Sequence, residues 1–144
     1  MTENNGMAAA LIVDDDKDWL KLVEIILAAQ GLRMEACDSP ATALDVAQRL
    51  QPNLIVLDVM MERMDGFQLL WHLTNDNITA GIPIVLLSSR DRPADIDWGR
   101  RLGAADYISK HMAVRELTET LARKAHSLMQ ASLAGTRGLV PGRV

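Results

Sequence analysis

Four short apolar runs in the chain are each closed or followed by a polar side chain. Residues 11–13, 54–57 and 84–87 form three of these runs, and a fourth begins at Tyr107. The first three show no alternation of polar and apolar residues, so both faces of each strand must be covered, as in a parallel sheet wrapped by helices. The polar residues that close or follow the runs are Asp14, Asp15, Asp16, Asp58, Ser88 and Lys110.

These polar residues are expected to share one edge of the sheet. In parallel α/β sheets, ligands bind in the crevice outside the carboxyl ends of the strands. Carboxylates, a hydroxyl and an ammonium group would converge in that crevice. Carboxylates held so closely repel one another unless a cation lies between them, and hard oxygen donors of this kind suit Mg²⁺. The pattern therefore predicts a Mg²⁺ site suited to phosphate chemistry.

Helical periodicity between the apolar runs predicts five βα units. Each expected strand is followed by a segment with apolar residues at helical spacing. Gly99 lies inside the helix that begins at Pro93, and it costs that helix about 1 kcal/mol relative to alanine. The expected strands are residues 11–13, 32–36, 54–57, 84–87 and 106–109, and the expected helices are residues 16–30, 40–51, 66–73, 93–102 and 114–125.

The composition is typical of one soluble globular domain. Of the 144 residues, 49% are apolar and 24% are charged, and no apolar stretch approaches the roughly 18 residues that a membrane helix requires. The polar start lacks the basic and apolar regions of a secretory signal, so we expect a cytoplasmic protein without membrane insertion. The single cysteine, Cys37, excludes an internal disulfide.

The distribution of charge argues against nucleic-acid binding. The net charge is -4, whereas binding to a phosphate backbone requires clustered lysine and arginine side chains. The arginines concentrate only around the helix expected at residues 93–102. We interpret them as a solvated face, with contact to an acidic partner as the alternative. They are Arg90, Arg92, Arg100 and Arg101.

The polar residues also follow one another in a recognisable order. An acidic pair follows the first strand, an aspartate the third, and a hydroxyl, an aromatic residue and a lysine follow in turn. In this order and spacing the chain resembles, from about residue 7 to residue 125, the receiver domain of two-component response regulators. The matching residues are Asp14, Asp15, Asp58, Met64, Asp65, Gly66, Ser88, Tyr107 and Lys110. The resemblance implies a flavodoxin-like, doubly wound (βα)5 fold with a parallel five-stranded sheet in the order 2-1-3-4-5.

The resemblance assigns a role to each matching residue. Asp58 would be the nucleophile that accepts a phosphoryl group from a histidine of a partner, because a carboxylate can form an acyl phosphate. Mg²⁺ would be held by Asp15, Asp58 and the backbone carbonyl of Met60, with Asp14 contributing through water. Lys110 would bind the remaining phosphoryl oxygens together with the hydroxyl of Ser88, which would complete the catalytic set.

The resemblance also implies a switch and its partners. The new phosphate would attract Ser88 and leave space for Tyr107, which changes the surface around the last strand. Taken alone, Tyr107 would be a half-buried aromatic residue with its hydroxyl in water. The implied partners are a cognate histidine kinase or phosphotransfer protein, and a downstream protein or covalently linked output domain. The receiver would catalyse only its own phosphorylation and dephosphorylation.

Two positions depart from the family pattern. The lysine is usually followed by proline through a cis bond, but His111 follows Lys110. A cis bond before another residue costs roughly 3 to 4 kcal/mol, so we predict either a strained cis bond or a trans bond that displaces Lys110 from Asp58. Glu62 replaces a common proline, which predicts a looser loop after Asp58. Met60 and Arg90 occupy positions that tune the phosphoryl lifetime in the family.

Other interpretations of the acidic residues remain open. Consecutive aspartates before a helix can act only as an N-cap. A haloacid-dehalogenase-type phosphatase also uses a strand-end aspartate and Mg²⁺, although that family requires a second aspartate where Met60 stands. A flavodoxin-like carrier has the same fold, but residues 14–16 would repel a flavin phosphate.

The resemblance divides the chain into three parts. We expect a disordered N-terminus at residues 1–6, a receiver domain at residues 7–125, and a helix extension with a flexible tail or linker at residues 126–144. A stand-alone receiver would act by docking onto another protein, whereas a fragment of a longer chain would act on a linked output domain.

Overall fold

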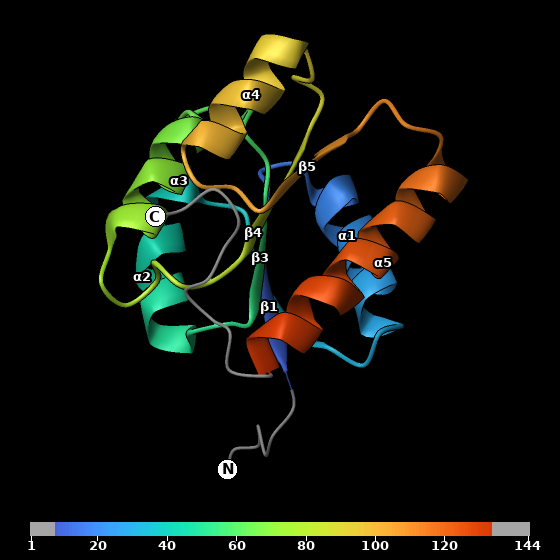
Figure 1. Cartoon of the computed structure of the whole chain (residues 1–144), viewed down its shortest axis with the longest axis horizontal. Helices are drawn as coiled ribbons and strands as arrows, with labels where there is room; N and C mark the ends of the chain where they lie inside the picture. The colour runs from blue at the N-terminus through green and yellow to red at the C-terminus, as the bar shows by residue number, and fades with distance from the viewer. Residues whose placement is uncertain (1–7, 134–144) are drawn as a thin grey trace.

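The computed structural model describes residues 8–133, which form a five-stranded parallel sheet in the order β2-β1-β3-β4-β5 (Figure 1). The strands are β1 (Ala9–Val13), β2 (Arg33–Cys37), β3 (Leu54–Leu57), β4 (Ile84–Ser88) and β5 (Asp106–Ser109). The helices are α1 (Lys17–Ala28), α2 (Pro40–Leu50), α3 (Gly66–Asn75), α4 (Pro93–Arg101) and α5 (Val114–Leu133). The predicted doubly wound α/β fold and its strand order are confirmed.

Helices cover both faces of this sheet. Figure 1 shows α1 and α5 on one side, and α2, α3 and α4 on the other. Every residue of β1, β3 and β4 is buried, which explains why their sequences do not alternate between polar and apolar residues. β2 lies at an edge of the sheet and is only partly buried, so its apolar character is weaker.

Two aspartates cap the N-terminal ends of helices at the carboxyl edge of the sheet. Asp16 Oδ1 accepts hydrogen bonds from the backbone amides of Asp18 and Trp19, so Asp16 is the N-cap of α1. Asp65 caps α3 in the same way by accepting the Phe67 amide at 2.9 Å. The N-cap interpretation therefore accounts for Asp16 and leaves the two aspartates before it for another role.

Gly99 allows α4 to lie close against the sheet. A Cβ atom at this position would lie 2.7 Å from Leu86 Cδ1 and 3.1 Å from Tyr107 Cδ2. The conformational cost of this glycine is therefore accompanied by close packing of α4 on β4 and β5. The helix forms over Pro93–Arg101 as predicted.

α5 continues past Ala125 to Leu133, within the range of the predicted helix extension. Ala125 and Met129 are buried in the cluster that α5 shares with α1 and the sheet, so the apolar stripe of the helix also continues. The predicted disordered N-terminus and the end of the predicted tail lie outside the described residues. Among the helices of residues 8–133, none is long and apolar enough to cross a membrane.

Candidate functional site

The carboxyl ends of β1, β3 and β5 bring two aspartates and a lysine together. The Lys110 ammonium lies 2.7 Å from Asp14 Oδ2 and 3.4 Å from Asp58 Oδ2. The side chains of all three residues are only 5% exposed. An ammonium group between two buried carboxylates offsets part of their repulsion, so the three side chains form one electrostatic unit. The convergence expected from the sequence is observed.

Asp15 adds a third carboxylate to this unit. One carboxylate oxygen from each of Asp14, Asp15 and Asp58 lies within 4.8 Å of the others. Asp15 is the more exposed of the three. Oxygen donors at this spacing suit a hard divalent cation, so the residues fit a metal ion. We call Asp14, Asp15, Asp58 and Lys110 the acid–lysine cluster.

The pKa of Asp14 reflects chiefly the burial of its carboxyl group. Burial raises the pKa of Asp14 to about 6, although the hydrogen bonds from Lys110 and from the Asp16 amide lower it. The nearby charge of Asp58 raises this pKa further. The cluster therefore resists carrying its full negative charge, and a bound divalent cation would relieve that resistance.

Lys110 reaches the two aspartates through a trans backbone. No peptide bond within residues 8–133 is cis, and Lys110 still lies beside Asp58. The prediction of a cis Lys110–His111 bond or a displaced lysine is therefore wrong. The physical reason lies in the backbone: the Lys110 amide donates to the Ser88 carbonyl at 2.9 Å, which continues the β4–β5 pairing and fixes the lysine before His111 is reached.

The aromatic ring of Trp19 contacts the Lys110 ammonium group. The Lys110 Nζ atom lies 4.7 Å from the centroid of the Trp19 ring, within the range of a cation–π contact. The ammonium group is thus held between carboxylates and an aromatic face. Trp19 belongs to α1, and helical periodicity holds no signal for a contact with Lys110, because the two residues belong to distant elements.

The loop between β3 and α3 is fastened to the acidic residues. Asp58 Oδ1 accepts the Met60 amide at 3.1 Å, and Asp15 Oδ2 accepts the Glu62 amide at 2.8 Å. Proline has no N–H, so a proline at position 62 could not form the second bond. Glu62 therefore supplies a hydrogen bond to Asp15 that a proline could not form, while the looser loop stays a prediction.

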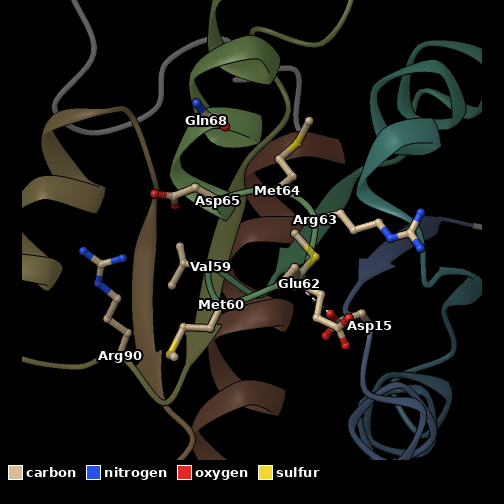
Figure 2. A pocket seen from close by; sticks show the side chains of 10 residues that line it. Asp15, Val59, Met60, Glu62, Arg63, Met64, Asp65, Gln68 and Arg90 are labelled. Carbon is tan, nitrogen blue, oxygen red and sulfur yellow. Dashed lines mark hydrogen bonds between the residues drawn. The ribbon is translucent and has the colours of Figure 1, made fainter.

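Gly66 explains the match at residues 64–66. A Cβ atom at Gly66 would lie 2.3 Å from the Asp58 carbonyl oxygen and 2.3 Å from Val59 Cα, so only glycine allows α3 to begin so close to this backbone. A pocket of about 690 Å³ opens beside the loop. Figure 2 shows Asp15 and Arg90 on opposite sides of this pocket, with Met60 between them.

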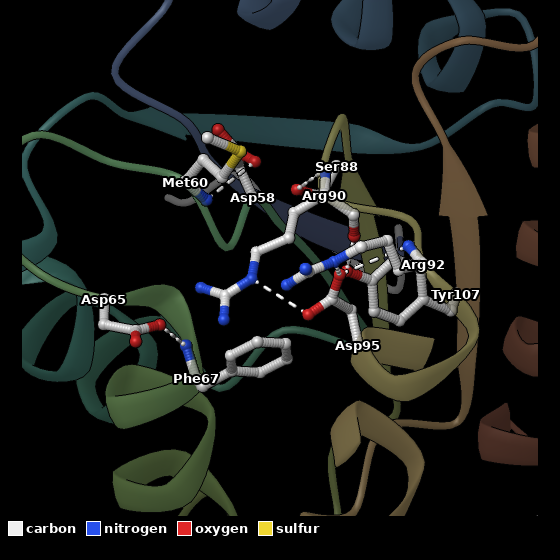
Figure 3. Close-up of polar contacts among 9 residues, drawn as sticks. All are labelled: Asp58, Met60, Asp65, Phe67, Ser88, Arg90, Arg92, Asp95 and Tyr107. Carbon is white, nitrogen blue, oxygen red and sulfur yellow. Dashed lines mark hydrogen bonds and ion pairs between the residues drawn. The ribbon is translucent and has the colours of Figure 1, made fainter. Parts of the chain in front are cut away.

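The predicted switch residues lie on the other half of the same edge. Ser88 is fully buried, and its Oγ accepts the Arg90 amide at 3.1 Å; within residues 8–133 it makes no hydrogen bond to Asp58. Tyr107 is 8% exposed, and its hydroxyl donates to the Arg90 carbonyl (Figure 3). The prediction of a half-buried aromatic residue with its hydroxyl in water is therefore wrong. Burial and, second to it, the charge of Asp95 raise the pKa of Tyr107 to about 12.

The side chain of Arg90 is anchored away from the acid–lysine cluster. Its Nε lies 3.0 Å from Asp95 Oδ1, and its guanidinium carbon lies 5.2 Å from the centroid of the Phe67 ring (Figure 3). Asp95 is buried and also pairs with Arg92 at 3.1 Å. We call Ser88, Arg90, Asp95 and Tyr107 the β4–α4 network.

The other two arginines of the local concentration are paired as well. Arg100 lies 3.4 Å from Asp106, and Arg101 lies 2.8 Å from Asp97. With Arg90 and Arg92 on Asp95, each member of the group has an acidic partner within the chain. The arrangement favours the interpretation as a solvated, paired face over contact with an acidic partner.

A doubly wound sheet with an acidic cluster that fits a metal ion, and a lysine beside it, places a candidate phosphate-binding site in the crevice where such sheets bind ligands. Residues 10–122 match the family model of the response regulator receiver domain. The chain therefore belongs to the response regulator receiver family of two-component systems. Its acidic pocket of Asp14, Asp15 and Asp58 fits the phosphorylation site with Mg²⁺ that is general in this family.

Individual relatives agree with this assignment. The chain is 30% identical over 115 residues to protein PilH of Pseudomonas aeruginosa, covering 80% of this chain and 95% of PilH. It is 33% identical over 129 residues to the DNA-binding dual master transcriptional regulator RpaA of Synechocystis, covering 88% of this chain but 54% of RpaA. The solved receiver domain of the Francisella response regulator 1452 aligns with a TM-score of 0.76 and 26% identity, over 87% of this chain and 98% of that one. None of these matches supports the phosphatase or the flavodoxin-like carrier.

Proposed function

We propose that Asp58 accepts a phosphoryl group from a phosphohistidine of a kinase or phosphotransfer protein. In this step the N–P bond of the donor breaks, its electron pair stays on the histidine nitrogen, and an Asp58 Oδ–P bond forms. The observation that carries the proposal is the position of Asp58 after the end of β3, beside the acidic pair and 3.4 Å from the Lys110 ammonium. This carboxylate has a fixed cation beside it and two further carboxylates within metal-binding reach.

Mg²⁺ is the metal that we propose for this site. Asp15 and Asp58 would hold it together with the backbone carbonyl of Met60, and Asp14 would contribute through water. Bound Mg²⁺ would supply charge neutralisation for the carboxylates and the phosphoryl oxygens. The all-oxygen donor set within 4.8 Å supports this choice, because hard carboxylate donors favour a hard cation.

Lys110 and Ser88 would bind the phosphoryl oxygens that the metal leaves free. Lys110 already lies 3.4 Å from Asp58 Oδ2, so its ammonium can stabilise charge on a group transferred to that carboxylate. The same groups surround Asp58 in both directions of the reaction. We therefore propose that the chain catalyses its own phosphorylation and dephosphorylation, and no other reaction.

Arg90 gives the proposed switch a physical connection. Ser88 would have to exchange its bond with the Arg90 amide for a bond to the phosphate, and the carbonyl of the same Arg90 holds the Tyr107 hydroxyl. A change at Ser88 is thus two hydrogen bonds away from Tyr107 on β5. We propose that this connection carries the phosphorylation signal to the surface formed by α4, β5 and α5.

The proposed partners are a cognate histidine kinase or phosphotransfer protein, and a downstream protein or linked output domain. The chain spans about half the length of RpaA, so both arrangements occur among proteins similar to it. We propose residues 7–125 as the receiver, residues 1–6 as a disordered start, and residues 126–144 as a helix extension and linker. We also propose a cytoplasmic location without membrane insertion. Because the net charge is -4, we propose no direct contact with nucleic acid.

Incubation with acetyl phosphate and Mg²⁺, followed by intact-protein mass spectrometry, tests the proposed function. Wild-type protein should gain the mass of one phosphoryl group, and peptide mapping should place it on Asp58. The Asp58→Ala variant should gain none. Because Mg²⁺ is the proposed metal, omitting it or replacing it with the larger ion Ca²⁺ should slow phosphorylation. Sustained release of phosphate without a covalent intermediate would contradict the proposal.

A further inference from the structure

A carboxylate from a different loop holds the turn that carries Lys110. Asp91 lies between β4 and α4, and its Oδ2 accepts hydrogen bonds from Ser109 Oγ and from His111 Nδ1, the second at 3.0 Å. Ser109 and His111 are the two neighbours of Lys110 in the chain. One carboxylate oxygen therefore fastens the residues on both sides of the lysine.

The donors and acceptors of these contacts agree with one another. An ionised carboxylate only accepts hydrogen bonds, so the Ser109 hydroxyl and the His111 Nδ1–H both donate to Asp91. The Ser109 oxygen in turn accepts the His111 backbone amide at 3.0 Å. The hydrogen bonds from Ser109 and His111 lower the pKa of Asp91, so its carboxylate stays ionised and keeps both contacts at neutral pH.

Lys110 itself is held at both ends. Its backbone amide donates to the Ser88 carbonyl at 2.9 Å, and its ammonium donates to Asp14 at 2.7 Å. The chain then turns toward α5, and the Met112 amide donates to the Ser109 carbonyl across this turn at 3.4 Å. Because that backbone bond is long, the side-chain contacts to Asp91 add to the hold on the turn.

We propose that Asp91 is a positioning residue for Lys110: through Ser109 and His111 it holds the turn so that the ammonium group meets the phosphoryl group on Asp58. The inference rests on the proposed function, because it assumes phosphorylation of Asp58. Asp91 also follows Arg90, whose carbonyl holds Tyr107. The loop that bears the proposed switch is thereby joined to the turn that bears the proposed catalytic lysine.

Two substitutions at position 91 separate hydrogen bonding from charge. Both bonds end on one oxygen, so the carbonyl oxygen of asparagine can accept both, whereas alanine can accept neither. With acetyl phosphate and Mg²⁺, Asp91→Ala should lower the maximal phosphorylation rate about tenfold, with the half-saturating donor concentration unchanged. Asp91→Asn should stay within about twofold of wild type.

Asp97 provides a matched control on α4. It is an exposed acid that pairs with Arg101 and, within residues 8–133, makes no hydrogen bond or ion pair to the Lys110 turn, so Asp97→Ala should phosphorylate at the wild-type rate. Asp91→Ala added to Lys110→Ala should change the remaining rate by less than about twofold, because a positioning residue has nothing left to position. An equal loss in Asp91→Ala and Asp91→Asn, or a further loss in the Lys110→Ala background, would overturn the proposal.

Amide hydrogen exchange tests the hold on the turn without any phosphorylation. Asp91→Ala should speed exchange of the Lys110 and His111 amides about tenfold, whereas Asp97→Ala should not. Unchanged exchange in Asp91→Ala would overturn the inference. If wild-type protein takes up no phosphoryl group, the proposed function fails and the exchange result still decides about the turn. If wild type and Asp91→Ala are phosphorylated equally fast, the positioning role alone fails.

Discussion

The acid–lysine cluster and the β4–α4 network share one edge of the sheet but differ in how their charges are balanced. The cluster holds three carboxylates against one ammonium group, so its side chains are short of positive charge. In the network, each polar group described has a partner: Arg90 pairs with Asp95, and its backbone serves Ser88 and Tyr107. The acid–lysine cluster is therefore short of a cation, whereas the polar groups of the β4–α4 network pair with one another.

This difference separates two tasks within the receiver. A site short of positive charge is suited to take up a cation, because the added charge offsets the repulsion among its carboxylates. A satisfied network responds only by exchanging one partner for another, which is the behaviour of a two-state element. The proposed site of phosphorylation and the proposed switch therefore lie side by side on one edge of the sheet, with different balances of charge.

Substitution of Lys110 should have the largest effect on phosphorylation and on stability. Lys110→Ala leaves two buried carboxylates without their ammonium partner, so phosphorylation of Asp58 should slow about 100-fold. The free energy of unfolding in EDTA should fall by about 3 kcal/mol, measured by urea titration at neutral pH. Lys124→Ala, which removes a lysine paired with Asp106 outside the cluster, is the control. A Lys110→Ala protein with unchanged kinetics would place the lysine outside the chemistry.

Gly66→Ala should disturb the backbone on which the cluster is built. The added methyl group would meet the carbonyl of Asp58 and the Cα of Val59, neither of which can rotate away. We expect a loss of about 3 kcal/mol in urea unfolding, at the upper end of overpacking. Gly31→Ala is the matched control: its φ of 80° is strained for alanine, but its added methyl group meets no atom within 4 Å. Equal losses in both variants would assign the effect to conformation and not to contact.

Acid should act in opposite directions on the two regions. In EDTA the pKa of Asp14 is raised by burial from 3.8 to about 6, so the folded protein binds its proton more tightly than the unfolded chain does. The stability from Asp14 should be full below about pH 4 and lost as the pH rises through about 6. The hydrogen bonds from Arg92, then from Arg90, lower the pKa of Asp95. Its contribution should be present above about pH 4 and lost on further acidification.

Unfolding free energies of wild type, Asp14→Asn and Asp95→Asn, measured by urea titration in EDTA between about pH 3 and pH 7, check these signs. The difference between wild type and Asp14→Asn should shift in favour of wild type as the pH falls. The difference between wild type and Asp95→Asn should shift the other way. Curves that remain parallel across this range would show that neither carboxyl group titrates differently in the folded protein.

Trp19→Leu should weaken the cluster from its aromatic side. The variant keeps apolar volume but removes the ring beneath the Lys110 ammonium, so phosphorylation should slow about fivefold to tenfold, matching a loss of 1 to 1.4 kcal/mol. Trp19→Phe keeps a π face and should recover part of the rate. Trp98→Leu, at a residue that is 51% exposed on α4, is the control. If phenylalanine and leucine behaved alike, the ring would act only as packing.

Gly99→Ala should give the smallest change in stability of these variants, and it should still affect Tyr107 of the β4–α4 network. Alanine gains about 1 kcal/mol of helix propensity, which contact with Leu86 and the Tyr107 ring should offset. Displacing the ring toward water should lower the pKa of Tyr107 from about 12, because burial is the main cause of its elevation. The chain has one tyrosine, so ultraviolet absorbance reads this ionisation directly. An unchanged titration would mean that α4 moves and the ring does not.

The sequence was sufficient for the features that depend on position along a single strand. Buried strands have no polar alternation, and the residues that follow them meet at one edge, so the convergence of Asp14, Asp58 and Lys110 could be predicted. The contacts of Trp19 with Lys110 and of Asp91 with the Lys110 turn join distant elements, and no local pattern records them. The wrong prediction for the Lys110–His111 bond came from the same source, because it weighed only the local cost of the peptide.

The indole face against Lys110 also gives the protein an internal optical reporter. A cation 4.7 Å from an indole ring perturbs its excited state, so whatever draws the ammonium away should alter the emission of Trp19. Trp71 and Trp98 are half exposed on α3 and α4 and would contribute a water-like background. Occupancy of the pocket should therefore be readable by fluorescence in the unlabelled chain.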